Sequence, residues 1–129
     1  MKNLLKVMGF VTIMVLVAMP LMAQGTISVP QVQVGTFSSS GTGLSTGSGE
    51  RQMTVTVSFP KSFSEKPKVI VGLTMIDAAG NVGTRVNAIA EGISRDGFTV
   101  IVKTWADSKV YGVSGSWVAI APTTVKVKP

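Results

Sequence analysis

The sequence predicts an all-β protein whose single small domain is a six-stranded antiparallel β-sandwich. Six segments either alternate polar with apolar residues or run apolar, as half-buried and central strands do. Polar stretches rich in glycine, serine, asparagine or aspartate separate these segments, and the later strands recur at the spacing typical of antiparallel sandwiches. Past the N-terminal apolar run, no segment shows the apolar periodicity of a helix.

The N-terminal end has the pattern of an export signal. Two lysines within the first six residues precede an uncharged apolar run at residues 7–19, which is too short for the roughly 20 residues of a spanning helix. The sequence therefore predicts a signal peptide over residues 1–23, cleaved after Ala23, and a secreted or extracytoplasmic protein, in a periplasm or at a cell surface, without a membrane span. Leu21 is larger than the residue usually preferred before such a site, so an uncleaved membrane anchor is the alternative.

Charge and missing residue types exclude several functions. Removal of the signal lowers the formal net charge from +6 to +4, and the remaining basic residues form no block, so the sequence predicts no nucleic-acid partner. The chain has no cysteine and no histidine, and therefore lacks disulfides, thiolate metal sites and the commonest general base. No two of its six acidic residues can be argued to face each other as glycosidase carboxylates must. We expect neither an enzyme nor a cofactor.

The first half of the domain begins with a short extended leader at residues 24–30. Residues 31–37 alternate polar with apolar and predict the first strand. Residues 38–49 are almost wholly serine, glycine and threonine, which predicts a long loop. A loop of this length is either functional or a flexible linker, and the sequence favours neither.

The next two strands are predicted at residues 51–59 and 68–77. In the first of them Met53, Val55 and Val57 share one face and threonines the other, so one face is expected to be buried. The second is a near-continuous apolar run, as in a central strand of a sandwich.

The last three strands are predicted at residues 84–91, 97–105 and 110–121, with polar turns between them. Residues 122–129 alternate only weakly and are bracketed by prolines and lysines, so we expect a frayed tail. The folded domain is therefore expected to span residues 31–121.

The order and spacing of particular residues on these strands resemble the H-type lectin domain, the family of snail agglutinins and discoidin-like proteins. The resemblance covers about residues 31–121, and its most specific part is a Thr-Trp pair, a short polar turn, Val-Tyr and Ser-Trp. The residues that carry it are Phe59, Pro67, Asp77, Arg85-Val86, Gly97-Phe98, Thr104-Trp105-Ala106-Asp107-Ser108-Lys109-Val110-Tyr111 and Ser116-Trp117. The resemblance implies a six-stranded sandwich that assembles as a homotrimer and binds sugars, typically N-acetylgalactosamine, in clefts between subunits.

Site residues follow from the same resemblance. The sugar-contacting arginine, tryptophan and tyrosine of the family fall on Arg85, Trp105 and Tyr111. A neighbouring subunit normally adds an aspartate from the loop before the second strand, where this chain has Ser48, with Glu50 the nearest acid. Beside the tryptophan, alanine 106 stands where some members carry a histidine. These two departures leave the sugar open.

The chemistry of these side chains agrees with that assignment. Trp105 and Tyr111 can form an aromatic platform for the C–H face of a sugar, and Arg85 offers a rigid fork of donors to its hydroxyls. Each also has a structural alternative: a core tryptophan, a corner tyrosine bonded to backbone, and a solvated arginine. Phe98 and Trp117 are expected in the core.

Two functions are consistent with the sequence. One is an exported lectin that recognises glycans, with N-acetylgalactosamine and galactose types as candidates, at clefts between the subunits of a homotrimer. The other is a structural or adhesive β-sandwich that binds no sugar, which the serine- and glycine-rich loop and the missing aspartate favour.

Overall fold

The computed structural model describes residues 25–40 and 43–128 of the chain, so the predicted signal peptide, residues 1–23, lies outside the described residues. The chain divides into two compact units; the described residues of one are 30–40 and 43–123, and those of the other are 25–29 and 124–128. The buried core and all predicted site residues belong to Pro30–Thr123. Within the described ranges, no helix has the length and apolarity needed to cross a membrane.

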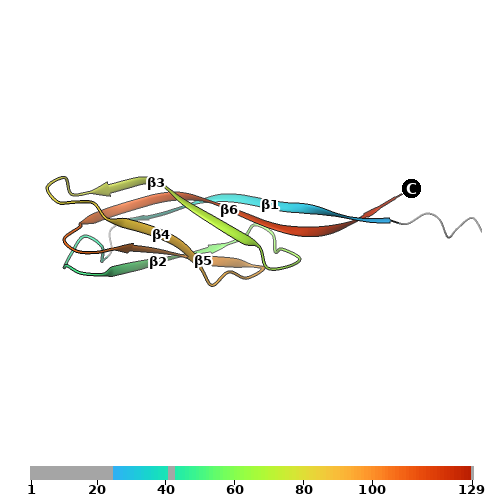
Figure 1. The fold of residues 1–129 in the computed structure, drawn as a ribbon, viewed down its shortest axis with the longest axis horizontal. Coiled ribbons are helices and arrows are strands. Elements are labelled where there is room, and N and C mark those ends of the chain that lie inside the picture. The colour runs from blue at the N-terminus through green and yellow to red at the C-terminus, as the bar shows by residue number, and fades with distance from the viewer. Residues whose placement is uncertain (1–24, 41–42, 129) are drawn as a thin grey trace, which may run out of the picture. The chain divides into compact units, whose positions relative to one another are not determined.

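Six strands form two three-stranded sheets, which Figure 1 shows as two layers. The first sheet has the order β1-β6-β3 and the second the order β2-β5-β4. Strand β3 pairs antiparallel with β6, and β2 and β4 each pair antiparallel with β5. The predicted all-β fold with six strands is therefore confirmed. The strands are β1 (Gly25–Ser40), β2 (Arg51–Ser58), β3 (Lys68–Ala78), β4 (Val86–Glu91), β5 (Gly97–Thr104) and β6 (Val110–Val127).

The first and the last strand along the chain are longer than the sequence predicts. Strand β1 begins at Gly25, inside the predicted leader, and β6 continues to Val127, through the segment expected to be frayed. The prolines that suggested strand ends are tolerated because of where they lie. Pro30 is on β1, an edge strand, and Pro122 lies beyond Ile120, the last β6 residue paired with β3.

The core lies between the two sheets. Every second residue of β5 is buried, and the inward face of β2 predicted from the sequence packs against the same core. The expected burial of Phe98 and Trp117 is confirmed, at 3% and 4% exposed. The buried apolar residues are Phe37, Leu44, Phe59, Phe63, Phe98, Val100, Val102, Val110, Val113, Trp117, Ala119 and Ala121.

Trp117 is the centre of an aromatic cluster in this core. Its ring centroid lies 5.5 Å from that of Phe59 and 5.6 Å from that of Phe98. On its other side the indole covers Gly35 of β1, where a Cβ atom would come within 2.5 Å of a ring carbon. Glycine is therefore required at position 35 because the indole fills the space that a side chain would need.

The packing of Trp117 also determines which face of β1 is buried. Because side chains alternate along a strand, Gly35 and Phe37 facing the core place Val32 and Val34 on the outside, where they are 52% and 65% exposed. The two valines of the predicted first strand thus point outward, contrary to the usual burial of apolar side chains, whereas Phe37 of the same strand is buried. The physical reason is steric: only glycine at 35 accommodates the indole.

Further apolar side chains lie on the outer side of the β1-β6-β3 sheet. Ile70 of β3 pairs with Val118 of β6 and is 68% exposed, and Ile120 is 42% exposed. We call this surface the outer apolar face and define it by Val32, Val34, Ile70, Val118 and Ile120. Large exposed apolar surfaces mark interaction sites more often than free surface.

Candidate functional site

Arg85 is held in place at both of its backbone polar groups. Its N–H donates to Oγ of Ser108 at 2.9 Å, and its carbonyl accepts from Oγ1 of Thr104 at 2.6 Å. Both hydroxyl residues are fully buried. Buried polar groups that satisfy each other in this way fix a position rigidly, so the Cα atom of Arg85 is anchored to the end of β5 and to the turn that follows it.

The side chain of Arg85 points along the same turn. Its Nη1 atom donates to Oδ1 of Asp107 at 2.7 Å, and the two side chains are 40% and 67% exposed. An exposed pair of this kind adds at most about 1 kcal/mol to stability. Its effect here is orientation, since it presents guanidinium donors and a carboxylate acceptor side by side to solvent.

Trp105 lies directly after the last residue of β5. It begins the connection of residues 105–109, which also carries Asp107 and Ser108 and which we call the Trp105 turn. Its side chain is 44% exposed, as expected for a ligand platform and not for a core tryptophan. The following residue, Ala106, has a φ of 57°, in the left-handed region that alanine rarely adopts. Such strain persists only where surrounding contacts enforce it, and it is common at functional sites.

Tyr111 is exposed because of an irregularity in the β3–β6 pairing. Asp77 pairs with Gly112 and Ala78 pairs with Val110, so Tyr111 has no cross-strand partner on β3. Val110 and Val113 both point into the core, and Tyr111 between them is 46% exposed. A β-bulge of this kind redirects one side chain, and here it turns the tyrosine outward.

The described part of the serine- and glycine-rich loop, residues 43–50, is fixed to this turn. Leu44 is 2% exposed, and its carbonyl accepts from the N–H of Val110 at 3.1 Å. The N–H of Gly49 donates to the carbonyl of Ala106 at 3.0 Å. Of the two alternatives left open by the sequence, these contacts favour an ordered loop beside the candidate site over a flexible linker.

Ser48 and Glu50, the predicted loop contributors, lie on this ordered segment. Ser48 is exposed, and Oε1 of Glu50 is 3.5 Å from Nζ of Lys103 on β5. The structure therefore brings the loop carrying both residues next to the Trp105 turn within one chain. It directs the Glu50 carboxylate toward a lysine of the same chain.

Two residues at the site are not predicted by the sequence. An aspartate in a turn, such as Asp107, usually bonds its own backbone, yet this one pairs with an arginine 22 residues away. The strand pattern predicts Arg51 only as the first residue of a strand, but its side chain contacts both loops. No local pattern signals either contact, because both join segments that meet only in the fold.

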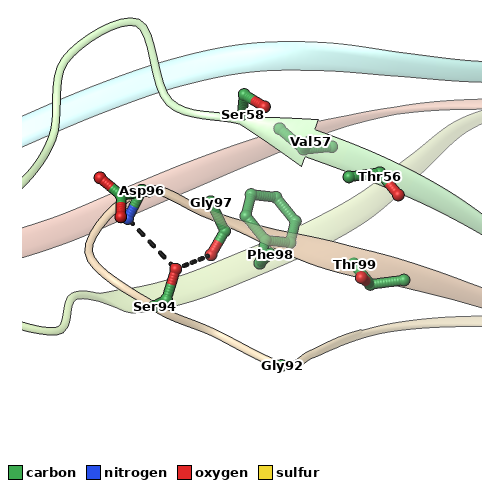
Figure 2. A pocket seen from close by; sticks show the side chains of 9 residues that line it. All are labelled: Thr56, Val57, Ser58, Gly92, Ser94, Asp96, Gly97, Phe98 and Thr99. Carbon is green, nitrogen blue, oxygen red and sulfur yellow. Dashed lines mark hydrogen bonds between the residues drawn. The ribbon is translucent and has the colours of Figure 1, made fainter.

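A hollow of about 270 Å³ lies at the opposite end of β5, against the end of β2 and the β4–β5 turn (Figure 2). The turn is held by its own bonds: Ser94 Oγ donates to the carbonyl of Gly97 and accepts from the N–H of Asp96, both at 3.2 Å. None of the predicted site residues lines this hollow. In the part of the chain that the structure describes, no three acidic side chains come together as metal ligands would.

Known proteins of similar sequence match more than half of the chain. ORF 7 of the ATP synthase subunits region of Fuscovulum blasticum is 39% identical over 75 residues, which cover 58% of this chain and 65% of that protein. Discoidin-2 of Dictyostelium discoideum is 34% identical over 94 residues, which cover 72% of this chain and 37% of that protein. The chain thus spans less than two thirds of each of these relatives.

A solved structure of a protein with similar sequence has a similar fold. Recombinant discoidin II of Dictyostelium discoideum superimposes with a TM-score of 0.69 at 33% identity, over 73% of this chain and 38% of that chain. The family model of the H-type lectin domain matches residues 54–120, which include Arg85, Trp105 and Tyr111. The chain therefore belongs to the H-type lectin domain family, as the spacing of its aromatic residues had indicated.

Proposed function

We propose that this protein is an exported lectin, not an enzyme, that binds glycans through Arg85, Trp105 and Tyr111 in clefts between the subunits of a homotrimer. The observation that carries the proposal is the anchored Arg85, whose guanidinium pairs with Asp107 on the turn that exposes Trp105. This arrangement provides an apolar surface and oriented polar groups together, which is what a sugar requires.

The division of labour among the side chains follows from their chemistry. Trp105 and Tyr111 provide aromatic surface for the C–H face of the ring, and Arg85 donates to hydroxyl or N-acetyl oxygens. Asp107 adds an acceptor for a neighbouring hydroxyl, because its carboxylate lies against the same guanidinium. Ser48 and Glu50 of the loop before β2 add polar groups at the edge of the proposed site. Because the Glu50 carboxylate lies near the Lys103 ammonium, Glu50 contributes as one partner of an ion pair.

Assembly into a trimer is supported by the outer apolar face. Its five residues lie on one side of the β1-β6-β3 sheet, and a second copy of this chain would remove them from water. Several weak sites presented together by one assembly bind a glycan-covered surface far more strongly than one site does. The trimer is therefore part of the proposed mechanism.

Substitution of Ile70 by glutamate is expected to convert the trimer to monomers. Ile70 is the most exposed large apolar residue of the outer apolar face, and a carboxylate placed there would be buried without a partner on assembly. Mass in solution by light scattering measures the effect. Thr54→Glu, an exposed position on the other sheet, is the matched control and should stay trimeric. An Ile70→Glu protein that is still trimeric would place the interface elsewhere.

Export is proposed from the N-terminal sequence. The basic start, the apolar run at residues 7–19 and the residues before position 24 have the order of a signal peptide. Intact mass of the protein recovered outside the cytoplasm should correspond to a chain that begins at Gln24. A chain that retains Met1 in a membrane fraction would support the uncleaved anchor.

The function is tested by a glycan array on the mature protein together with its mass in solution. The lectin proposal expects binding of a defined glycan set by a trimer, with N-acetylgalactosamine and galactose structures as the first probes. An intact trimer that binds no glycan would instead support a structural or adhesive module. Two observations favour that second function: serine occupies position 48, and the nearest acid, Glu50, is engaged by Lys103.

A further inference from the structure

The guanidinium of Arg51 lies at the centre of six backbone carbonyl groups. Four belong to the loop before β2: Nε donates to Gly49 at 3.0 Å, and Nη1 shares its two N–H groups among Leu44, Thr46 and Gly47 at 3.2, 2.9 and 3.3 Å. The other two belong to the Trp105 turn, where Nη2 donates to Ala106 at 3.2 Å and to Ser108 at 2.8 Å. One side chain therefore joins two segments that are more than 50 residues apart in sequence.

We propose that Arg51 is the positioning residue of the site: it folds residues 43–50 around its guanidinium and clamps them to the Trp105 turn before any ligand arrives. Its effect on sugar affinity rests on the proposed function, whereas its effect on loop order does not. Arg51 itself touches no sugar, and acts through the loop and through Trp105.

The composition of the loop explains why such a residue is needed. Residues 43–50 contain one large apolar side chain, Leu44, so burial of apolar surface cannot order the whole segment. Gly43, Gly47 and Gly49 adopt φ values of 75° to 81°, which bend the chain tightly. Carbonyl dipoles that converge on one point repel each other unless a cation lies between them. Arg51 provides that cation.

Arginine has the required shape. Its planar fork carries five N–H donors and a charge that persists at all relevant pH values, so it can bond carbonyl groups on both of its edges at once. A lysine at this position would have three donors on a single atom, and could not reach both segments with good geometry. Charge-assisted bonds of this kind are stronger than neutral ones.

The clamp also supports the strained residue beside the aromatic platform. The carbonyl of Ala106 accepts from Nη2 of Arg51 and from the N–H of Gly49, and the backbone of Ala106 is left-handed where it makes these two contacts. Because Ala106 follows Trp105 directly, release of its carbonyl lets the turn relax and changes the direction of the indole.

Two variants test the proposal, Arg51→Lys and Arg51→Ala, with Arg95→Lys as the matched control. The side chain of Arg95 donates to one backbone carbonyl, that of Phe63, which is not part of residues 43–50. In both Arg51 variants we expect the amides of Gly49 and Val110 to exchange hydrogen at least about tenfold faster, because each belongs to the clamped loop contacts. The fluorescence emission maximum of Trp105 should shift. The amides of β5 in the core should keep their protection against hydrogen exchange.

The glycan affinity of the Arg51 variants should fall together with their amide protection. Affinity for immobilised N-acetylgalactosamine, or for the tightest glycan of the array, is expected to fall about tenfold to a hundredfold, the effect of losing charge-assisted bonds. The Arg95→Lys protein should bind as the wild type does. Guanidinium chloride at about 50 mM should partly restore amide protection and affinity in Arg51→Ala, and sodium chloride at the same concentration should not. That concentration is far below the molar range in which guanidinium unfolds proteins.

The outcomes separate the two proposals. Faster exchange at Gly49 and Val110 in a protein whose wild type binds no glycan would support the clamp and reject the lectin. Unchanged exchange and unchanged Trp105 emission in both Arg51 variants would overturn the clamp, even if glycans bind. Arg51→Lys keeps the charge and serves as the readout if Arg51→Ala does not fold.

Discussion

Replacement of Trp105 by alanine is expected to weaken glycan binding at least about 30-fold at each site while the fold stays intact. Truncation of a tryptophan that anchors a ligand typically costs about 2 kcal/mol or more, which corresponds to that factor. The same side chain is 44% exposed and outside the core, so its loss should change the free energy of unfolding by only about 0.5 kcal/mol. On a glycan-coated surface the loss should be larger, because multivalent binding amplifies it.

Titration calorimetry with a soluble glycan and thermal unfolding of the same samples separate the two quantities. Trp105→Phe is the graded control, since it keeps an aromatic face of smaller area and should retain part of the affinity. Trp105→Ala should also remain trimeric. A variant that binds with full affinity would show that the sugar lies elsewhere on the molecule.

Replacement of Trp117 by alanine is expected to unfold a large fraction of the protein. Loss of a buried aromatic side chain costs about 3–5 kcal/mol, against a total stability of about 5–15 kcal/mol for a small domain. Trp117 is 4% exposed and contacts the rings of Phe59 and Phe98, and its removal would also leave Gly35 without a packing partner. Binding should be lost only as far as the folded population is lost.

Urea unfolding followed by circular dichroism measures this effect. Trp117→Phe is the matched control, and its cost should be smaller, because aromatic packing is kept and Nε1 of Trp117 has no hydrogen-bond partner among the described residues. A Trp117→Ala protein with wild-type stability would contradict the core role that the structure gives this residue.

The two tryptophans show how much of the site could be predicted. For Trp105, the position at a strand end left a core role open, and the family resemblance assigned it to the site. Its exposure in the structure excludes the core role. Trp117 lies in the apolar register of its strand and is buried, as predicted from its position, because a period of two relates side chains on one strand without reference to any other. Five of the expected strands begin within two residues of the observed ones for the same reason.

The outward direction of Tyr111 is a different case. Period-two alternation from Val113 would place it inside, but a bulge opposite Asp77 and Ala78 shifts the phase and turns it out. A bulge depends on the partner strand, so no pattern within β6 reveals it. The family resemblance pointed to Tyr111, but alternation along the strand did not.

The sequence by itself determined the all-β class, the six strands, the inward face of β2, the burial of Phe98 and Trp117, and, through a resemblance, the family. All of these depend on local alternation and on the spacing of a few residues along the chain. Only the tertiary structure decided that Val32 and Val34 point outward, that residues 43–50 are ordered, and that Arg51 and Asp107 belong to the candidate site. The physical reason is common to these findings: each depends on contacts between segments far apart in sequence, such as an indole over a glycine, or one guanidinium between two loops.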